Sequence, residues 1–247
     1  EEFRNEMDSL SFYSHQKACS TWEERGKEIE PIWCPKLDEN GKPMLDENNQ
    51  VSKDPNVSIL AKNDETPRPA TSMEKLSTLR TIIGRKSKAF LTAGNSCPVS
   101  DGAAAQLWMT RELAEEYGFK IRATIIDYAV VGTDPILMLT GPIESVPKVL
   151  ERANMSLDNM DFIEINEAFS PVVYASCYEL GLDWKDPRFN PWGGAIALGH
   201  PTGMTGCRLI GTNLSQLEQS RKEFAISSMC VGLGMGAATI IRNEHPK

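Results

Sequence analysis

Three polar residues suited to acid–base or nucleophilic catalysis follow strand-like or glycine-rich segments: Asn166, His200 and Cys230. Asn166 comes directly after the apolar run F-I-E-I, His200 lies within G-G-A-I-A-L-G-H-P-T-G, and Cys230 opens C-V-G-L-G-M-G. Ligand sites of α/β proteins collect at the carboxyl ends of strands, so these side chains are predicted to converge. A histidine and a thiol form an acid–base pair, and an asparagine can donate a hydrogen bond to a developing oxyanion.

Each of the three residues also has an ordinary structural interpretation. Asn166 could cap a helix that begins at Glu167. His200 could cap or pack within a tight glycine-rich turn, and Cys230 could be a small buried residue that closes a strand. A glycine run such as G-L-G-M-G is weak evidence for a phosphate site by itself. Spacing alone therefore leaves both an active site and these structural roles open.

The predicted elements alternate between strands and helices, which indicates an α/β layered domain with a mixed sheet. Strands are predicted from residue 89 and over residues 121–131, 161–165, 224–229 and 237–241. Helices are predicted over residues 1–30, 71–79, 111–117, 146–153 and 167–180, and after the loop around His200. A glycine turn over residues 230–236 joins the last two strands into a hairpin.

A change of composition marks residues 35–67, where Asp, Asn, Lys, Gly and Pro dominate and L-D-E-N occurs twice. Two short turn-linked strands or an exposed excursion would suit this segment, which we interpret as a probable insertion. The doubled tetrapeptide is too short to be a structural repeat. A boundary near residue 120 is predicted to divide the chain into residues 1–120 and 121–247.

The overall composition is that of a soluble globular protein, with 247 residues, 40% apolar and 24% charged. A net charge of -8 argues against nucleic acid as a partner, and no apolar run approaches the ~20 residues that a membrane span needs. The six cysteines are scattered without C-x-x-C pairs, so we expect thiols in a reducing compartment. We predict neither a metal site nor a tightly bound cofactor.

Six segments in order along the chain resemble the thiolase family. They are S-H-Q-K-A from Ser14, D-E-T-P-R-P-A-T-S-M-E-K-L from Asp64, T-A-G-N-S-C-P-V-S-D-G-A-A-A from Thr92, N-E-A-F from Asn166, G-G-A-I-A-L-G-H-P-T-G from Gly193 and C-V-G-L-G-M-G from Cys230. The resemblance implies an acyltransferase of lipid metabolism and β-oxidation. Thiolases make or break a carbon–carbon bond of 3-oxoacyl-CoA by a Claisen-type reaction, through an acyl-enzyme on a cysteine.

The resemblance also implies roles for individual residues. Cys230 would remove or return the α-proton of acetyl-CoA, and His200 would activate the nucleophilic cysteine and help to bind the thioester oxygen. Asn166 would hold a water in that oxyanion site, and the backbone N–H of Gly232 would belong to a second one. CoA and acyl-CoA would be substrates. The residues expected to contact the CoA arm are Ser96, Cys97 and Met204.

The chain also departs from the family pattern. None of its other cysteines lies in a motif that matches the acylated cysteine, which thiolases carry in their N-terminal half. We therefore expect the C-terminal part of a thiolase, incomplete without an N-terminal half or a complementary subunit, in a homo- or hetero-oligomer of the cytoplasm or mitochondrial matrix. Val231, Leu233 and Met235 stand where glycine and glutamine are frequent, which would reshape the acyl pocket or weaken the second oxyanion site.

Two other functions remain open at this point. One is a non-catalytic thiolase-like subunit that binds acyl-CoA or scaffolds a complex. The other is a condensing enzyme of the ketoacyl-synthase type, which fits less well because those enzymes use histidines where this chain has Cys230.

Overall fold

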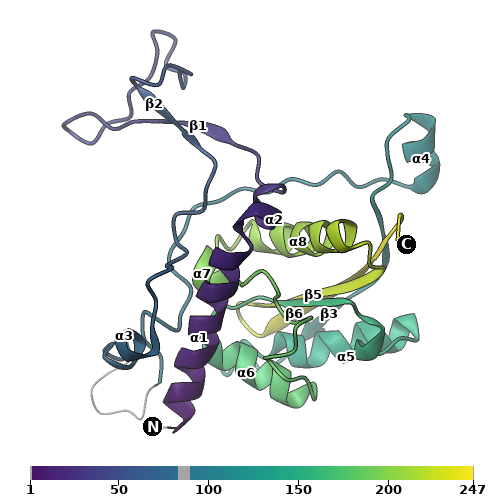
Figure 1. Ribbon diagram of the computed structural model, residues 1–247. Coiled ribbons are helices and arrows are strands. Elements are labelled where there is room, and N and C mark those ends of the chain that lie inside the picture. The colour runs from purple at the N-terminus through teal and green to yellow at the C-terminus, as the bar shows by residue number, and fades with distance from the viewer. Residues whose placement is uncertain (1, 83–89, 247) are drawn as a thin grey trace.

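The core of the molecule is one four-stranded mixed sheet, which confirms the predicted α/β class (Figure 1). The computed structural model describes residues 2–82 and 90–246. The strand order is β3–β6–β5–β4, with antiparallel pairing of β3 with β6 and of β6 with β5, and parallel pairing of β5 with β4. The strands are β3 (Ala123–Gly132), β4 (Phe162–Ile165), β5 (Phe224–Val231) and β6 (Met235–Asn243).

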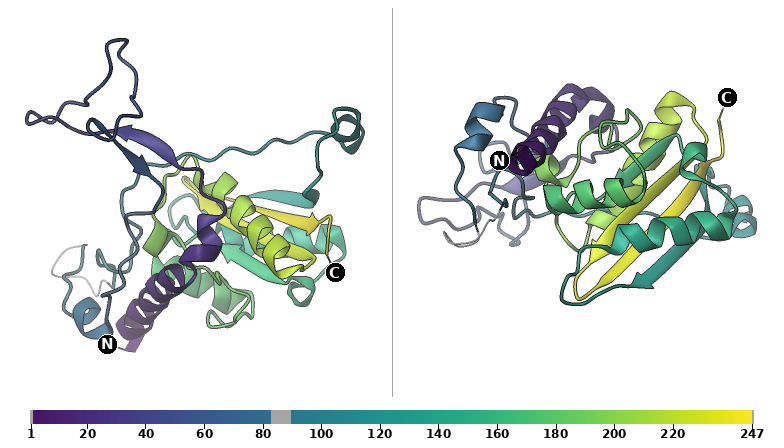
Figure 2. Two further views of the ribbon diagram at one scale, coloured as in Figure 1. Left: turned by 45° about the horizontal axis from the view of Figure 1, so that its top comes forward. Right: turned by 90° about the horizontal axis from the view of Figure 1, so that it is seen from below.

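Helices cover both faces of this sheet (Figure 2). On one face, α5 (Gly141–Ala153) contacts β3, β5 and β6, with α6 (Ser170–Glu179) beside it. On the other face, α8 (Thr205–Ser220) contacts β4, β5 and β6. Buried side chains of α5 recur at helical spacing, at Val146, Val149 and Leu150, so one side of the helix lies in the core.

The first helix is shorter than predicted and is broken. Instead of one helix over residues 1–30, α1 (Glu2–Ser20) is followed by α2 (Trp22–Gly26). The break lies at Thr21, whose backbone leaves the helical region with φ -110° and ψ 26°. Its hydroxyl and its backbone N–H both donate to the Lys17 carbonyl oxygen, at 2.8 and 3.1 Å. Three short helices complete the set: α3 (Met73–Ser77), α4 (Arg111–Glu116) and α7 (Ala195–Leu198), with a 3₁₀ turn η1 (Leu157–Asn159). Helix α1 packs against α3, α6 and α7.

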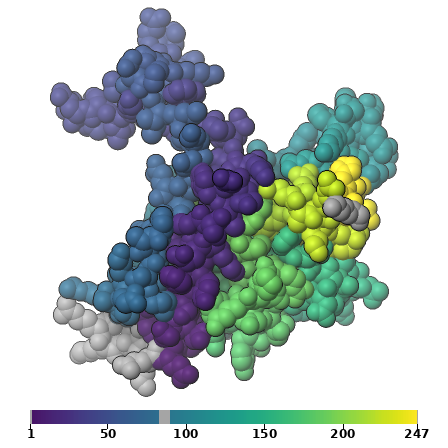
Figure 3. Space-filling view, in the orientation of Figure 1, coloured from purple at the N-terminus to yellow at the C-terminus, as the bar shows by residue number. Residues whose placement is uncertain are grey.

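Residues 32–61 form an arm that projects from the body of the molecule (Figure 3). Its base is the antiparallel pair β1 (Ile32–Pro35) and β2 (Ser58–Ala61). The two L-D-E-N segments between them form the same turn. In each, the aspartate Oδ1 accepts hydrogen bonds from backbone N–H groups two and four residues further on: Asp38 from Asn40 and Lys42, and Asp46 from Asn48 and Gln50. The repeat is thus a local turn motif.

The strand predicted from residue 89 is not found in the described part of the chain. Ala89 itself lies outside the described residues, and residues 90–110 make only isolated bridges, between Thr81 and Thr92 and between Ser96 and Phe169. Residues 98–110 run extended from the body toward α4 (Figure 2). A strand needs a neighbour to share its backbone hydrogen bonds, and no described segment lies in register with this one.

Smaller differences concern element ends. The strand predicted from residue 121 begins at Ala123, and the helix predicted from residue 167 begins at Ser170. The sequence predicts that Cys230 opens the glycine turn, but this residue lies inside β5 and pairs with Gly236 of β6. The turn between β5 and β6 is therefore only three residues long, Gly232 to Gly234.

Candidate active site

Asn166 and His200 meet where β4 ends. The Nδ2 atom of Asn166 lies 3.2 Å from Nε2 of His200. The Asn166 backbone N–H continues the sheet by donating to the Ser228 carbonyl oxygen at 2.9 Å, which fixes the residue just beyond β4. The alternative that Asn166 caps the following helix is wrong, because that helix starts at Ser170 and Phe169 occupies its N-cap position.

Thr205 fixes the orientation of the His200 ring. Its hydroxyl donates to the Pro201 carbonyl oxygen at 2.9 Å, and its Oγ1 lies 2.7 Å from Nδ1 of His200. Since a hydroxyl has one proton, Oγ1 accepts from Nδ1–H, so Nε2 carries no proton and accepts a hydrogen bond from the Asn166 side-chain amide. Sequence reasoning missed Thr205. Its signal was its position in the first turn of the helix that follows the glycine-rich loop.

The imidazole of His200 is neutral at neutral pH. Burial lowers its pKa below the usual value, and the nearby positive charge of Arg208 lowers it further. A neutral ring with an unprotonated Nε2 can take a proton from a thiol. Once protonated, the same Nε2–H can donate a hydrogen bond to a thioester oxygen, so one atom can serve in both steps.

Cys230 lies in the sheet next to the same segment. Its side chain is buried against Ala168 and Val172, two and six residues after Asn166. Burial raises the pKa of the Cys230 thiol, so the protonated form is the resting one. The structure thus brings Asn166 into contact with His200 and places Cys230 beside Ala168, just beyond Asn166. No hydrogen bond joins Cys230 to His200 among the described residues. The catalytic roles of these residues and of Gly232 stay predictions.

Glu167 holds the glycine-rich loop in place. Its buried carboxylate accepts hydrogen bonds from the Ser14 hydroxyl at 2.6 Å, the Asn190 side-chain amide at 3.0 Å and the Ile196 backbone N–H at 3.2 Å. A side chain at Gly194 would run into this carboxylate. Glu167 therefore joins α1 to the loop that carries His200, a role that the residue's place in N-E-A-F did not reveal.

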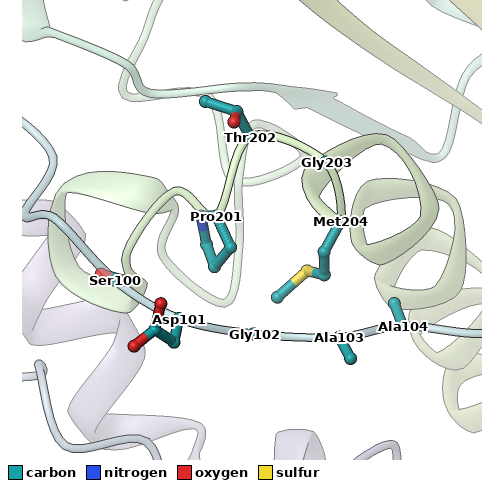
Figure 4. Close-up of a pocket in the computed structure, with 9 residues that line it drawn as sticks. All are labelled: Ser100, Asp101, Gly102, Ala103, Ala104, Pro201, Thr202, Gly203 and Met204. Atoms are coloured by element: carbon teal, nitrogen blue, oxygen red, sulfur yellow. The ribbon is translucent and has the colours of Figure 1, made fainter.

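The residues expected at the CoA arm lie along the extended tract and the His200 loop. The Cys97 backbone N–H donates to the Ala168 carbonyl oxygen at 3.1 Å, and burial raises the pKa of its thiol. Ser96 is buried, and its hydroxyl donates to the Thr92 carbonyl oxygen at 2.8 Å. Met204 points toward the extended tract at Gly102 (Figure 4). Contact of all three residues with CoA stays a prediction.

A cavity of about 450 Å³ opens between the extended tract and the His200 loop (Figure 4). One of its walls begins directly after His200 in the sequence, but none of the lining residues is a catalytic candidate. Its walls come from residues 100–104 on one side and from residues 201–204 on the other.

Behind the site lies a buried ion pair between β4 and α8. Glu164 Oε2 is 3.6 Å from an Arg208 guanidinium nitrogen, which is an ion-pair distance too long for a hydrogen bond, and Gln216 donates to Oε1 at 2.9 Å. Burial raises the pKa of Glu164 to about 7, although the Arg208 charge opposes the shift. Arg208 thus acts on both Glu164 and His200.

The raised pKa of Glu164 predicts a stability that falls as the pH rises. Between the ordinary carboxyl value and about 7, the folded protein holds a proton that the unfolded chain has lost, so raising the pH favours unfolding. One pKa unit corresponds to about 1.4 kcal/mol. The histidines with lowered pKa values, such as His200, contribute the opposite trend in both proteins, so the comparison is between native protein and Glu164→Gln. We expect denaturant titrations to show the free energy of unfolding of the native protein falling by a few kcal/mol relative to that of Glu164→Gln from pH 5 to 8.

The matched control is Glu115→Gln, which changes an exposed carboxylate of α4. It should leave the pH dependence of the native protein unchanged. A Glu164→Gln variant with the native pH dependence would show that Glu164 is ionised throughout this range.

The described residues contain no group of three or more His, Cys, Asp or Glu side chains placed to hold a metal ion. In that same part of the chain, no helix combines the length and apolar character needed to cross a membrane. All six cysteines have free thiols.

Two family models match the chain. The "Thiolase, N-terminal domain" model matches residues 3–112, and the "Thiolase, C-terminal domain" model matches residues 119–243. A similar protein is the beta-ketoadipyl-CoA thiolase of Acinetobacter baylyi, 39% identical over 96% of this chain and 55% of the relative. Another is the peroxisomal 3-ketoacyl-CoA thiolase B of Rattus norvegicus, 38% identical over 98% of this chain and 54% of the relative.

Solved structures give the same result. The Bacillus anthracis acetyl-CoA acetyltransferase superposes with a TM-score of 0.82 at 31% identity, over 97% of this chain and 56% of that chain. Human mitochondrial 3-ketoacyl-CoA thiolase superposes with a TM-score of 0.81 at 30% identity. The chain spans about half the length of the curated relatives it matches.

Proposed function

The chain belongs to the thiolase family, and from that premise we propose that it is part of an acyl-CoA acyltransferase. The reaction is thiolytic cleavage of 3-oxoacyl-CoA or the reverse condensation with acetyl-CoA. The observation that carries this proposal is the chain of contacts from Asn166 to His200 and from His200 to Thr205, in which Nε2 of a neutral imidazole is unprotonated and so can take a proton.

In this proposal, the residues divide the work as follows. His200 takes the proton of a nucleophilic cysteine and then donates to the thioester oxygen, while Cys230 exchanges a proton with the α carbon. The buried Oδ1 atom of Asn166 accepts no hydrogen bond from any described residue, which suits a bound water at that position. The backbone N–H of Gly232 is the second oxyanion donor. CoA is a substrate, and no tightly bound cofactor takes part.

The nucleophilic cysteine is proposed to come from an N-terminal thiolase half, either as a further segment or as a partner chain. The extended tract supports this. No backbone N–H of residues 98–109 donates to a backbone carbonyl among the described residues, and Val99, Leu107 and Trp108 are exposed. Extended backbone with free hydrogen-bonding groups and apolar side chains is suited to joining another sheet. We call this chain together with that half the complete assembly.

We propose that the chain divides near residue 120. The loop region and the end of the N-terminal domain occupy residues 1–120, with a probable insertion at 35–67, and the C-terminal domain occupies residues 121–247. The two family-model matches, which leave residues 113–118 between them, support this division. A homo- or hetero-oligomer is expected. The six free thiols support a reducing compartment, the cytoplasm or the mitochondrial matrix.

The test compares the complete assembly with this chain alone. Intact mass and N-terminal sequencing of the native material should find a cysteine-bearing thiolase half, and thiolysis of acetoacetyl-CoA should require it. A sample of these 247 residues alone that folds, dimerises and cleaves acetoacetyl-CoA would refute a supplied nucleophile. An assembly that binds acyl-CoA but never cleaves it would instead identify a non-catalytic subunit.

A further inference from the structure

The side chains at the end of β4 divide between the two faces of the sheet. Ile163 and Ile165 join the core cluster that includes the buried side of α5. Glu164 points the other way, toward α8, where Gln216 donates to its carboxylate at 2.9 Å. Asn166 comes two residues later, so it lies on the same face as Glu164. Both side chains therefore face the α8 side of the sheet.

Helix α8 places two residues opposite this pair. Thr205 and Arg208 are three residues apart, which puts them on the same side of the helix. Thr205 holds Nδ1 of His200 at 2.7 Å, and Asn166 holds Nε2 of the same ring at 3.2 Å. One turn further along α8, an Arg208 guanidinium nitrogen lies 3.6 Å from a Glu164 carboxylate oxygen. The layer of contacts that holds the His200 ring is thus adjacent to the layer that holds Arg208.

The Arg208 guanidinium acts on its neighbours mainly through its charge. Its side chain is only 13% exposed, and both terminal nitrogens are buried without a hydrogen-bond partner among the described residues. Two carboxyl groups accompany it: Glu164 on β4, and Glu28, which follows α2 and accepts from Thr212 of α8 at 2.9 Å. A buried charge persists only where opposing charges or dipoles surround it. The fold therefore keeps a positive charge close to His200.

This charge opposes protonation of the His200 ring. Burial lowers the pKa of His200, and the Arg208 charge lowers it further. Burial also raises the pKa of Glu164 to about 7, although the Arg208 charge opposes that shift, while Glu167 and Glu28 add to it. The Glu164 carboxyl therefore already holds its proton at the lower pH where His200 titrates. At that pH it no longer offsets the charge of Arg208.

We propose that Arg208 is a positioning residue for His200, whose buried positive charge keeps the imidazole in the neutral form that accepts a proton. This inference rests on the proposed function, in which Nε2 of His200 takes the proton of a nucleophilic cysteine. Arg208 acts through the ring and needs no contact of its own with the substrate. A ring that stays neutral to lower pH keeps the base available where an ordinary histidine is already protonated.

The experiment measures the titration of His200 in the complete assembly. The C2 hydrogen of a histidine ring exchanges with deuterium at a rate that rises to a plateau as the ring loses its proton, and peptide masses report each histidine separately. Arg208→Gln should move the midpoint for His200 to higher pH, because the opposing charge is gone. Arg208→Lys keeps the charge and should leave the midpoint near the native value. The midpoints of His15 and His245 should not move in either variant.

Two control variants separate the loss of charge from local damage. Glu164→Gln changes the neighbour of Arg208 but replaces a carboxyl that is already protonated where His200 titrates, so the His200 midpoint should stay at the native value. Arg221→Gln removes the same charge from the exposed end of α8 and should also leave the midpoint unchanged. If Arg208→Gln does not fold, combining it with Glu164→Gln avoids a buried carboxylate without its cation, and the midpoint should rise in the double variant.

Activity gives a second readout. At acid pH, kcat/KM of Arg208→Gln for acetoacetyl-CoA should fall by about 10-fold for each unit by which the His200 midpoint rises, and at alkaline pH it should approach the native value. An unchanged midpoint in Arg208→Gln, or an equal rise in Arg208→Lys, overturns the role of Arg208 alone, because the exchange measurement needs no turnover. A native assembly without any thiolysis overturns the proposed function, while the midpoints still show whether Arg208 keeps the ring neutral.

Discussion

Replacing Cys230 by alanine in the complete assembly is expected to lower kcat/KM for thiolysis of acetoacetyl-CoA by about 10²- to 10⁴-fold, the range that general acid–base groups contribute. Burial against Ala168 and Val172 raises the pKa of this thiol, so at neutral pH it carries the proton that the α carbon must receive when acetyl-CoA leaves. Removing the thiol removes that donor, but it leaves the donors near His200 in place.

The pH profile gives an independent check on Cys230. Because the proton donor works only while protonated, thiolysis should persist above the ordinary thiol pKa and fall as the pH rises through the raised value. Cys207→Ala, on α8 with no proposed role, serves as the matched cysteine control. Native activity in Cys230→Ala would remove Cys230 from the mechanism.

Replacing His200 by alanine is expected to cause a loss of similar size, about 10²- to 10⁴-fold in kcat/KM, because Nε2 is the proposed base. The lowered pKa keeps the imidazole neutral below the usual titration range of histidine. The acid limb of the native profile should therefore lie below that range, with activity falling as the pH decreases through the lowered pKa. His245→Ala, an exposed histidine, is the control and should be fully active.

Two matched substitutions at Thr205 test whether the His200 imidazole must be held in one orientation or need only be present. Thr205→Ser keeps the acceptor for Nδ1–H and should retain most activity, whereas Thr205→Val removes it and should lower kcat more than it raises KM. Equal activity of the serine and valine variants would contradict the assigned tautomer.

The sequence predicted the elements whose side chains show a clear period. The hairpin of β5 and β6 and the core side of α5 follow from alternation and from helical spacing. Element ends were less accurate. The glycines that follow Cys230 predict a turn there, but pairing with Gly236 extends β5 past it, since glycine can pair in a sheet. The place of Cys230 in the sequence could not show whether it belongs to the strand or to the turn.

The main residues of the candidate site could be predicted from the sequence, but several of the contacts that hold them could not. Asn166 and His200 were identified from their places after a strand and in a glycine-rich loop, and they do meet. Two other contributions depend on how the chain folds in three dimensions: the hydrogen bond between the Glu167 carboxylate and Ser14, 153 residues apart, and the Arg208 charge near His200. Local patterns carry no information about such pairings.

The arm that carries the two L-D-E-N turns is held together by its own hydrogen bonds. Among the described residues, every hydrogen bond of residues 36–57 has its partner between residues 36 and 58, and none of the side chains in this range is buried. These loops therefore depend on their own aspartates. Loops of this kind tolerate inserted sequence, because a longer tip disturbs no distant contact. The exposed arm is consequently a place to attach a fluorophore or an affinity tag away from Asn166 and His200.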